Sequence, residues 1–358
     1  MNTELQIPVP AQLEIQTAMA MDEAVDLACE ELGLPLIGGP SGSGWSMYAV
    51  AQRCPHLFRR QYIDIRKPVG GSAHRAPVSA DEPVQDLRVP AVPLQVGGLY
   101  HTLQAFYYAH GLGEYTVHDR GLIRAELKPM RGRKKDGRTI PADAADKLLA
   151  KLKEMAQPIE AQLQASLGNG KPPRYPSAGI IYEAERCFDA HTSFETTDDI
   201  EPLAVEWFAR HPGLGFTCRY DAIMKVGAND PRFPKDAVVI YERKTAAWLN
   251  EMNLTGWFID GEILGQIMCW DAGGCKELFG PLTAVVVDIV TKAKTPQLHQ
   301  VIVGADVSAV KEHERWIGYQ NSEIALWKAT GAYPKRWAAC FDKFGKCSNI
   351  DACMRGEK

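Results

Sequence analysis

The sequence lacks an excess of basic residues and any long hydrophobic run. Its 358 residues carry 40 Lys and Arg against 44 Asp and Glu, which gives a formal net charge of −4 at pH 7. This balance excludes a protein with a wholly basic surface, so any contact with nucleic acid must be local. The longest apolar candidate, residues 282–290, carries Asp288 and is far shorter than the roughly 18 residues of a membrane span. We therefore expect no membrane partner.

The N-terminus lacks the features of a secretory signal. Such a signal needs a basic start followed by an apolar run, whereas residues 1–27 carry acidic residues. No internal repeat or low-complexity tract is visible. We expect an intracellular protein, and an apolar content of 46% is sufficient for a large core.

Cysteine, in contrast, is abundant, with nine residues. Disulfides are rare in intracellular proteins, so the spacing of the cysteines bears on a metal site instead. Five stand singly in apolar or helical contexts and are expected to be small buried side chains: Cys29, Cys187, Cys218, Cys269 and Cys275. The other four are Cys54 and a C-terminal group of Cys340, Cys347 and Cys353. Four thiolates suit zinc or an iron-sulfur cluster, and sequence alone separates the two poorly.

The spacing of apolar residues predicts an α/β protein with a mixed central sheet flanked by helices. Helices are predicted over residues 17–34, 47–65, 97–111, 141–168, 259–274 and 309–331, and strands over 201–211, 215–227, 236–245 and twice within 282–303. Ser46 is the predicted cap of the second helix, and residues 67–97 are predicted to be mostly loop. We expect an N-terminal appendage, residues 1–40, followed by one domain, residues 41–358.

A carboxylate and an amine end the third predicted strand, in residues 236–250 (DAVVIYERKTAAWLN). Because strand side chains alternate, Glu242 and Lys244 share one face while Arg243 points to the other. Asp221 lies on the preceding strand, which we expect to pair with this one. Two carboxylates at adjacent strand ends suit Mg²⁺ or Mn²⁺, and a nearby ammonium could orient or deprotonate a water that attacks a phosphodiester.

Asp221 followed after about twenty residues by Glu242-x-Lys244 resembles the PD-(D/E)XK nuclease superfamily. A Glu-x-Lys pattern alone is weak, because alternating charges are common on exposed strands. The RecB-like branch adds a histidine at the start of an upstream helix, a glutamate before the aspartate and a glutamine after the lysine. The matching residues are His101, Glu206 and Gln266.

One position departs from this pattern. The tyrosine that usually follows the glutamine by four residues is replaced by Trp270, which keeps a stacking surface but loses a hydroxyl. No catalytic role is therefore expected of Trp270.

The four remaining cysteines are similar to the one-plus-three iron-sulfur staple of AddB-type and CRISPR-associated RecB-like nucleases. The resemblance implies a [4Fe-4S] cluster that ties residues 340–353 to Cys54 on the first helix of the domain, with Zn²⁺ as the alternative occupant. The six residues between Cys340 and Cys347 are more than the two common in that group.

The resemblance implies a restriction-endonuclease-like core and a Mg²⁺- or Mn²⁺-dependent deoxyribonuclease. It implies an exonuclease on DNA ends or single strands in replication, recombination or repair, in a bacterial or phage-infected cytoplasm. Asp221, Glu242 and His101 would hold the cation with the Arg243 carbonyl, and Lys244 would position or activate water. Gln266 would steady the substrate or the lysine. Two alternatives stay open: an inactive DNA-binding scaffold for a helicase or recombination partner, and a structure-specific endonuclease.

A basic stretch lies at residues 120–138, within a predicted insertion at 110–175. It has eight Lys and Arg and two acids, a local charge of +6. Charge alone favours a solvated loop, but beside a nuclease site the stretch would contact the phosphate backbone. The expected DNA-binding residues are Arg124, Lys128, Arg131, Arg133, Lys134, Lys135 and Arg138.

Overall fold

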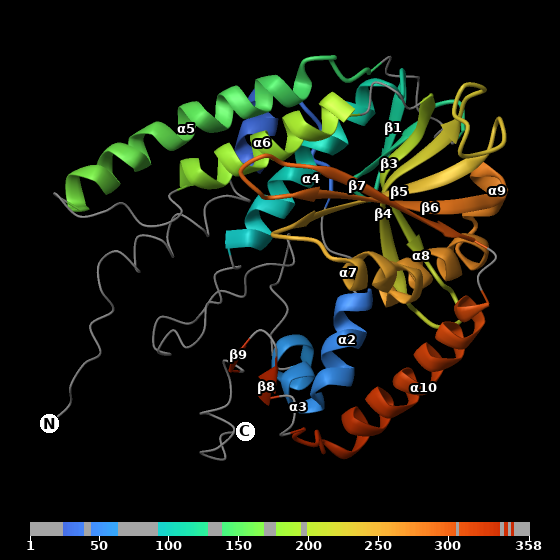
Figure 1. Ribbon diagram of the computed structural model, residues 1–358. Helices are drawn as coiled ribbons and strands as arrows, with labels where there is room; N and C mark the ends of the chain where they lie inside the picture. The colour runs from blue at the N-terminus through green and yellow to red at the C-terminus, as the bar shows by residue number, and fades with distance from the viewer. Residues whose placement is uncertain are drawn as a thin grey trace, which may run out of the picture.

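The computed structural model describes residues 24–38, 44–63, 92–127, 138–167, 177–194, 199–305, 308–336, 340–342 and 345–346. Over these residues the protein has an α/β fold built on a seven-stranded sheet (Figure 1). The strands lie in sequence order: β1 Tyr115–His118, β2 Gly121–Arg124, β3 Ile200–Arg210, β4 Thr217–Val226, β5 Val238–Ala246, β6 Leu282–Thr291 and β7 Leu298–Gly304. β5 and β6 are parallel and the other neighbours antiparallel, which confirms the predicted mixed sheet.

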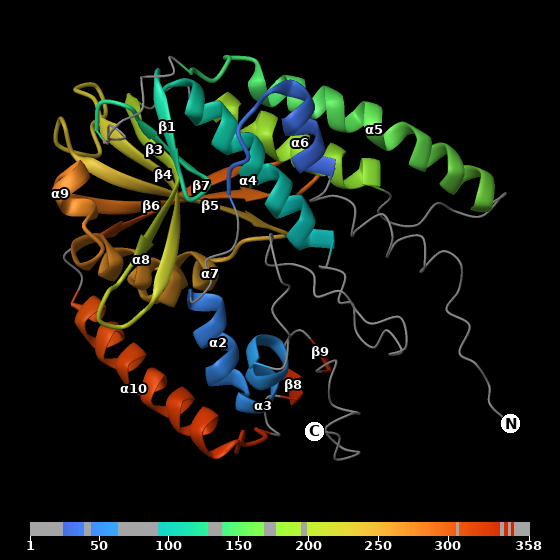
Figure 2. The same ribbon diagram turned by 180° about the vertical axis from the view of Figure 1, so that it is seen from behind.

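Helices cover both faces of the sheet, and each face has its own apolar core. One face carries α4 (Val92–His110), α5 (Ala144–Leu167) and α6 (Ser177–Phe194), seen together in Figure 2. A helix over residues 24–32 packs into the same core through Ala28 and Cys29. The opposite face carries α2 (Trp45–Arg53), α8 (Gly261–Ala272), α9 (Cys275–Phe279) and α10 (Ala309–Thr330). No helix among the described residues is long and apolar enough to cross a membrane.

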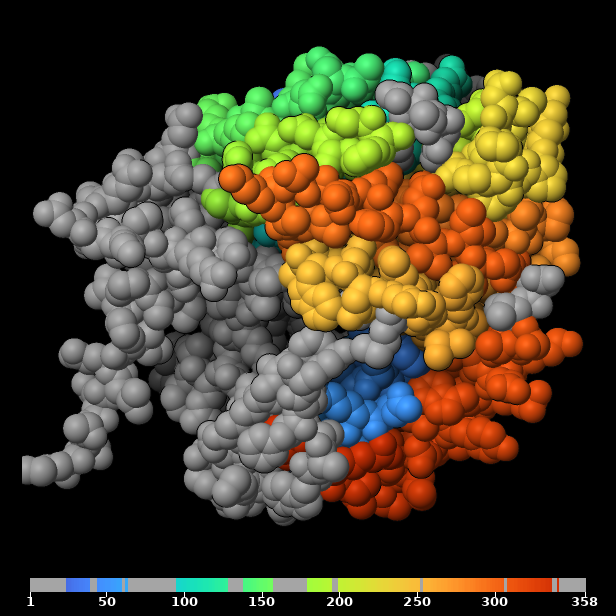
Figure 3. All heavy atoms as spheres, viewed as in Figure 1, coloured from blue at the N-terminus to red at the C-terminus, as the bar shows by residue number. Residues whose placement is uncertain are grey.

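The segment between β5 and α8 contains α7 (Glu251–Gly256) and a 3₁₀ turn, Trp257–Ile259. In Figure 3 this segment forms the surface between β7 and α2, and the 3₁₀ turn contacts β7. It therefore links the end of β5 to the start of α8.

The sheet forks between β4 and β5. These strands pair from Lys225–Val238 to Ala222–Tyr241 and then part. Beyond the fork, β4 continues beside β3 and β5 continues beside β6. The first residues past the last pair are Asp221 and Glu242, so the fork places them across from each other.

Strands β3 and β4 also change faces at the fork. Val205 belongs to the α4 core and Trp207, two residues later, to the α8 core. On β4, Ala222 likewise belongs to the α4 core and Tyr220 to the α8 core. The residue between Val205 and Trp207 is Glu206, whose φ of 53° is in the left-handed region. This local distortion turns Glu206 out of the regular alternation.

The predicted helix over residues 47–65 is interrupted. α2 ends at Arg53, Cys54 is extended, and α3 (Pro55–Phe58) with a π-turn (Arg59–Ile63) follows. Pro55 causes the break, because proline disfavours helical geometry in the residue before it and removes a helical donor. The predicted cap at Ser46 is wrong, since Gly44 occupies that position and gives no side-chain hydrogen bond.

Two further expectations about local structure need correction. α4 begins at Val92, so residues 92–97 are helical and His101 lies in mid-helix instead of the first turn. The sequence pattern also missed α6 and the β1–β2 hairpin. That hairpin turns at Asp119 and Arg120, both with positive φ, and Gly121 follows them. A Cβ at Gly121 would lie 2.4 Å from the Glu206 carbonyl oxygen, so only glycine fits this approach.

Candidate active site

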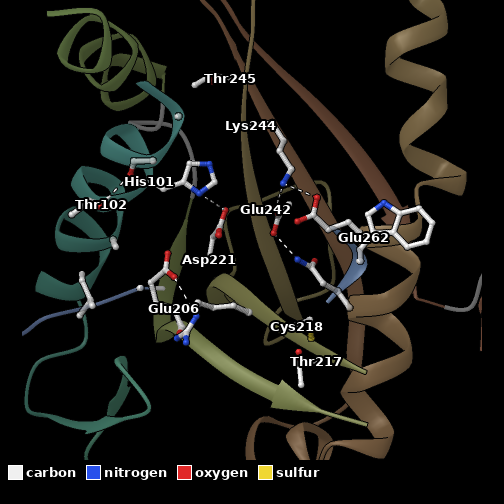
Figure 4. A pocket seen from close by; sticks show the side chains of 18 of the residues that line it. His101, Thr102, Glu206, Thr217, Cys218, Asp221, Glu242, Lys244, Thr245 and Glu262 are labelled. Atoms are coloured by element: carbon white, nitrogen blue, oxygen red, sulfur yellow. Dashed lines mark hydrogen bonds and ion pairs between the residues drawn. The ribbon is translucent and has the colours of Figure 1, made fainter. Parts of the chain in front are cut away.

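A pocket of about 640 Å³ opens at the fork of the sheet. Its lining includes all six sequence-predicted catalytic residues: His101, Glu206, Asp221, Glu242, Lys244 and Gln266. These come from α4, β3, β4, β5 and α8, and Figure 4 shows five of them, all but Gln266, labelled around one space. The fold thus brings together residues separated by as many as 165 positions in the chain.

Asp221 is fixed by the strand from which β4 has parted. The backbone amide of Arg243 donates a hydrogen bond of 2.8 Å to Asp221 Oδ2, where a ladder bond would otherwise stand. Asp221 is buried, and this bond engages only one of its two carboxylate oxygens. The Asp221 carboxylate thereby replaces a backbone carbonyl as the acceptor for this amide and still faces the pocket.

Glu242 is held by two side chains. Lys244 Nζ lies 2.5 Å from Glu242 Oε1, and Gln266 Nε2 donates a hydrogen bond of 2.6 Å to Glu242 Oε2. The predicted shared face of Glu242 and Lys244 is therefore confirmed. Gln266 comes from α8, which packs against β3, β4 and β6.

Glu262 is a member of the site that the sequence pattern missed. Its Oε2 accepts a hydrogen bond of 2.9 Å from Lys244 Nζ, and it lies one helical turn before Gln266. Asp260 caps this helix by accepting from the Glu262 amide at 2.8 Å. The i, i+4 spacing of Glu262 and Gln266 at a capped helix start was the signal that could have revealed it.

His101 reaches the site from α4. Its Nδ1 lies 3.4 Å from Asp221 Oδ2. Burial lowers the pKa of His101, but the Asp221 carboxylate outweighs it, so the net pKa is raised. His101 therefore faces the predicted cation site as a partner of Asp221.

Glu206 lines the other end of the pocket. Its nearest basic neighbour is Arg219, whose Nε lies 4.0 Å from Glu206 Oε2 and whose guanidinium donates to the Glu206 carbonyl at 2.7 Å. Burial and the nearby Asp221 charge raise the pKa of Glu206 to about 7. The structure thus groups Glu206 with the fork residues.

The charges in the pocket are unevenly balanced. Burial and the neighbouring Asp221 carboxylate raise the pKa of Glu242 to about 8. Burial opposes ionisation of Asp221 as well, but His101 and Lys244 lower its pKa overall. Burial lowers the pKa of Lys244, yet Glu242, Glu262 and Asp221 together raise it well above its usual value. Lys244 is therefore held as an ammonium between carboxylates.

This donor set fits a hard divalent cation. Two buried carboxylates repel each other, and Mg²⁺ commonly binds one or two carboxylates with water or phosphate oxygens completing its shell. Within the described ranges, no group of three or more His, Cys, Asp or Glu side chains is close enough together to hold a metal by itself. The fit accordingly rests on Asp221 and Glu242.

Trp270 does not take part in the site. Its ring is 1% exposed and packs against Tyr220 and Phe279, while its Nε1 donates to the Gly280 carbonyl at 3.0 Å. The expectation that Trp270 offers a stacking surface is therefore wrong, because its indole is buried in the core between α8 and the sheet.

The predicted basic loop is partly sheet. Arg124 ends β2, forms an ion pair with Glu201 and donates to the Pro202 carbonyl at 2.7 Å, with only 16% of its side chain exposed. Arg124 is thus engaged within the sheet, contrary to the loop expectation. Arg138 is exposed. Lys128, Arg131, Arg133, Lys134 and Lys135 lie outside the described residues.

Of the four predicted cluster ligands, two lie within the described residues and two lie outside them. Cys54 joins α2 to α3 and Cys340 is buried, whereas Cys347 and Cys353 lie outside the described residues. The five single cysteines are all buried, as predicted. The chain that leads to Cys340 returns to α2 and α3: Arg336 donates to the Gln52 carbonyl, and the Arg59 guanidinium lies 5.4 Å from the Tyr333 ring.

No family model matches the sequence, and no curated protein matches it. Among solved structures, the chain is similar to one from Eubacterium rectale described as a "Putative exonuclease", with 10% sequence identity and a TM-score of 0.29. That comparison covers 72% of this chain and 91% of the other. A likeness at this level transfers neither an activity nor site residues to this chain.

Proposed function

We propose that this protein is a divalent-cation-dependent deoxyribonuclease that hydrolyses phosphodiester bonds, acting as an exonuclease on DNA ends or single strands. The observation that supports it is the meeting of Asp221, Glu242 and Lys244 in one pocket at the fork of the sheet. Two acids and one amine around a single space are the groups that phosphodiester hydrolysis needs.

Asp221 and Glu242 would hold the cation, which would offset the charge that develops on the phosphate. The chain's own residues prepare this place. The Arg243 amide fixes Asp221, and Gln266 fixes one oxygen of Glu242. Both carboxylates are therefore oriented before substrate arrives, which lowers the reorganisation needed in the transition state.

Lys244 acts as a cationic clamp. An ammonium has three N–H donors, and Glu242 and Glu262 account for two of them. The third can donate to a phosphate oxygen or orient the attacking water. Because neighbouring carboxylates raise the pKa of Lys244, it serves as a charge and a donor rather than as a base in the cation-free site.

A cysteine-bound cluster belongs to the same proposal. Cys54, Cys340, Cys347 and Cys353 would hold a [4Fe-4S] cluster, or Zn²⁺ in its place. The contacts of Arg336 with Gln52 and of Tyr333 with Arg59 support it, since they bring the chain before Cys340 to the helices beside Cys54. Ligation would close a very long loop, so the cluster would stabilise the fold.

The decisive experiment is digestion of end-labelled linear DNA and of circular single-stranded DNA, with and without Mg²⁺ or Mn²⁺. We expect cation-dependent loss of linear DNA, and no cleavage by Lys244→Met with its thermal unfolding intact. Lys276→Met is the matched control, because Lys276 is exposed and outside the pocket. Cleavage of the circle would select an endonuclease. Binding without cleavage would select an inactive scaffold, and wild-type cleavage by Lys244→Met would reject the mechanism.

A further inference from the structure

The pocket extends past Lys244 around the end of β5. Lys244 and Thr245 are consecutive on the strand and leave it on opposite sides (Figure 4). Lys244 points to Glu242 and Glu262 on the α8 side. Thr245 lies on the α4 side, where Lys292 also lines the pocket. We call the part of the pocket lined by Thr245, Lys292, Gly97 and Gly98 the second arm.

Lys292 is placed in the second arm by the parallel pairing of β5 and β6. Its backbone amide donates to the Ala246 carbonyl at 2.7 Å, one position beyond the end of β6. Its ammonium donates to Thr245 Oγ1 at 3.4 Å. The arm thus offers an ammonium and a hydroxyl group side by side.

Cys187 and Glu183 of α6 lie near Lys292. Burial lowers the pKa of Lys292, and the smaller effects of Cys187 and Glu183 oppose this shift. Glu183 also accepts a hydrogen bond of 2.7 Å from Arg186. An anion that enters the arm would therefore restore the stabilisation that burial takes from the Lys292 charge.

The floor of the arm is bare helix. Gly97 and Gly98 lie inside α4, where each glycine costs on the order of 1 kcal/mol relative to alanine. A Cβ at Gly97 would approach Thr245 Oγ1 to 3.5 Å, and one at Gly98 would meet nothing within 4 Å. A side chain at Gly97 would therefore extend toward Thr245 and narrow the arm, and glycine leaves it open.

The positive charge of Lys292 would give the second arm a role in binding DNA that the main site lacks. The main site contains the carboxyl groups of Asp221, Glu242, Glu206 and Glu262, and those that are ionised repel a DNA strand until a cation is bound. An ammonium at the second arm lies outside this acidic group. It can hold a neighbouring phosphate of the strand whether or not the cation is present.

We propose that Lys292 and Thr245 form a phosphate-binding subsite that holds the phosphodiester next to the one at Lys244. This inference rests on the proposed nuclease function and deepens it. Lys292 and Thr245 are positioning residues in this account, and they fix which bond of the strand reaches Asp221 and Glu242.

The test is binding of a labelled oligo(dT) of about 12 nucleotides in EDTA, where cleavage is absent, over a series of salt concentrations. We expect Lys292→Gln to bind about tenfold more weakly, because a charge-assisted hydrogen bond is lost. Its log–log salt slope should fall by about 0.7, the contribution of one contact to a single strand. Lys294→Gln is the matched control, because Lys294 is exposed, two residues away and outside the pocket.

A second pair of variants keeps the test independent of any folding defect at Lys292. Thr245→Val removes the hydroxyl at constant shape and should weaken binding about threefold, whereas Thr245→Ser should bind as the wild type does. In Mg²⁺, Lys292→Gln should raise KM more than it lowers kcat. Equal affinity and equal salt slope for Lys292→Gln and Lys294→Gln would overturn the inference, as would wild-type protein that fails to bind the oligonucleotide.

Failure of the subsite and failure of the nuclease proposal give different results. A wild-type protein that binds DNA but never cleaves it with Mg²⁺ or Mn²⁺ rejects the nuclease, and the Lys292 and Lys294 comparison still decides the subsite. A protein that cleaves DNA and gives no difference between these two variants rejects the subsite alone.

Discussion

The backbone amide of Arg243 holds the side chain of Asp221 at 2.8 Å, at the point where their two strands separate. The Arg243 side chain leaves β5 on the opposite face, is 1% exposed, and lies under the Tyr108 ring with its guanidinium carbon 3.9 Å from the ring centroid. α4 therefore clamps the residue whose amide positions the carboxylate. The packing of α4 on the sheet thereby bears on the position of Asp221 at the fork.

Tyr108→Leu should test this link. Loss of the aromatic ring removes a buried cation–π contact, and we expect a destabilisation of roughly 3 kcal/mol with a fall in cleavage rate. Tyr108→Phe keeps the ring and loses only the hydrogen bond of 3.0 Å to His191 Nε2, so it should lose about 1 kcal/mol and retain the rate. Denaturant unfolding and cleavage rates measure both, and equal rates for the two variants would contradict the link.

Divalent cation should stabilise the folded protein through Asp221 and Glu242. A ligand at one hundred times its dissociation constant stabilises by about 2.7 kcal/mol, so Mg²⁺ or Mn²⁺ should raise Tm by several degrees and EDTA should reverse the rise. Asp221→Asn keeps an oxygen for the Arg243 amide but loses the charge, so its Tm should not respond. A full cation response in Asp221→Asn would place the cation elsewhere.

The buried His313 should make the free energy of unfolding decrease as the pH falls below 6.5. It packs against Trp45, Trp316 and Phe216, and burial lowers its pKa to about 4. In the unfolded chain its pKa is about 6.5. Between pH 6.5 and 4 the unfolded chain takes up a proton that the folded state refuses, so stability present above pH 6.5 is lost as pH falls.

His313→Phe should remove this component. At pH 4 the wild type should have lost roughly 3 kcal/mol more than the variant, relative to each protein at pH 7.5. Urea unfolding at a series of pH values measures the difference, and other titrating groups contribute to both proteins alike. Parallel pH profiles would show that His313 is not buried as a neutral group.

The cysteine ligands should give a spectroscopic signal. Anaerobically purified protein should absorb in the visible region, and Cys54→Ser or Cys340→Ser should lose that absorbance and unfold at lower temperature. Cys269→Ser is the control for the absorbance, because Cys269 lies on α8 and is buried in the core. A colourless protein that contains stoichiometric zinc would replace the cluster by Zn²⁺ and keep the staple. A colourless protein without bound metal would rule out the metal staple altogether.

Particular elements show how far the sequence predicted the fold. The alternation in residues 238–246 and the run 282–291 identified β5 and β6 directly, and the helical spacing at 309–330 identified α10. The short β1–β2 hairpin escaped because its four-residue strands are too short for a periodic signal, and the turn depends on positive φ at Asp119 and Arg120. α6 lies in the stretch between the helix predicted over 141–168 and the strand predicted over 201–211, to which no element was assigned.

The site shows a similar division. Glu242, Lys244 and their common face followed from strand geometry, and Asp221 from its place on the adjacent strand. Glu262 could not be found in this way, since its contact with Lys244 depends on where the tertiary structure places the start of α8 relative to β5. The burial of Trp270 likewise depends on the packing of α8 against β4, which no local pattern records.

The sequence by itself determined which residues carry charge, which faces of the strands are apolar, and that one acid and one amine end the same strand. These are local properties, because side-chain period and composition are written in neighbouring residues. Only the tertiary structure decided that the sheet forks at Asp221 and Glu242, that Glu262 flanks Lys244, and that Lys292 opens a second arm beside Thr245. Such relationships arise from the packing of distant segments, where burial and strand separation set the distances.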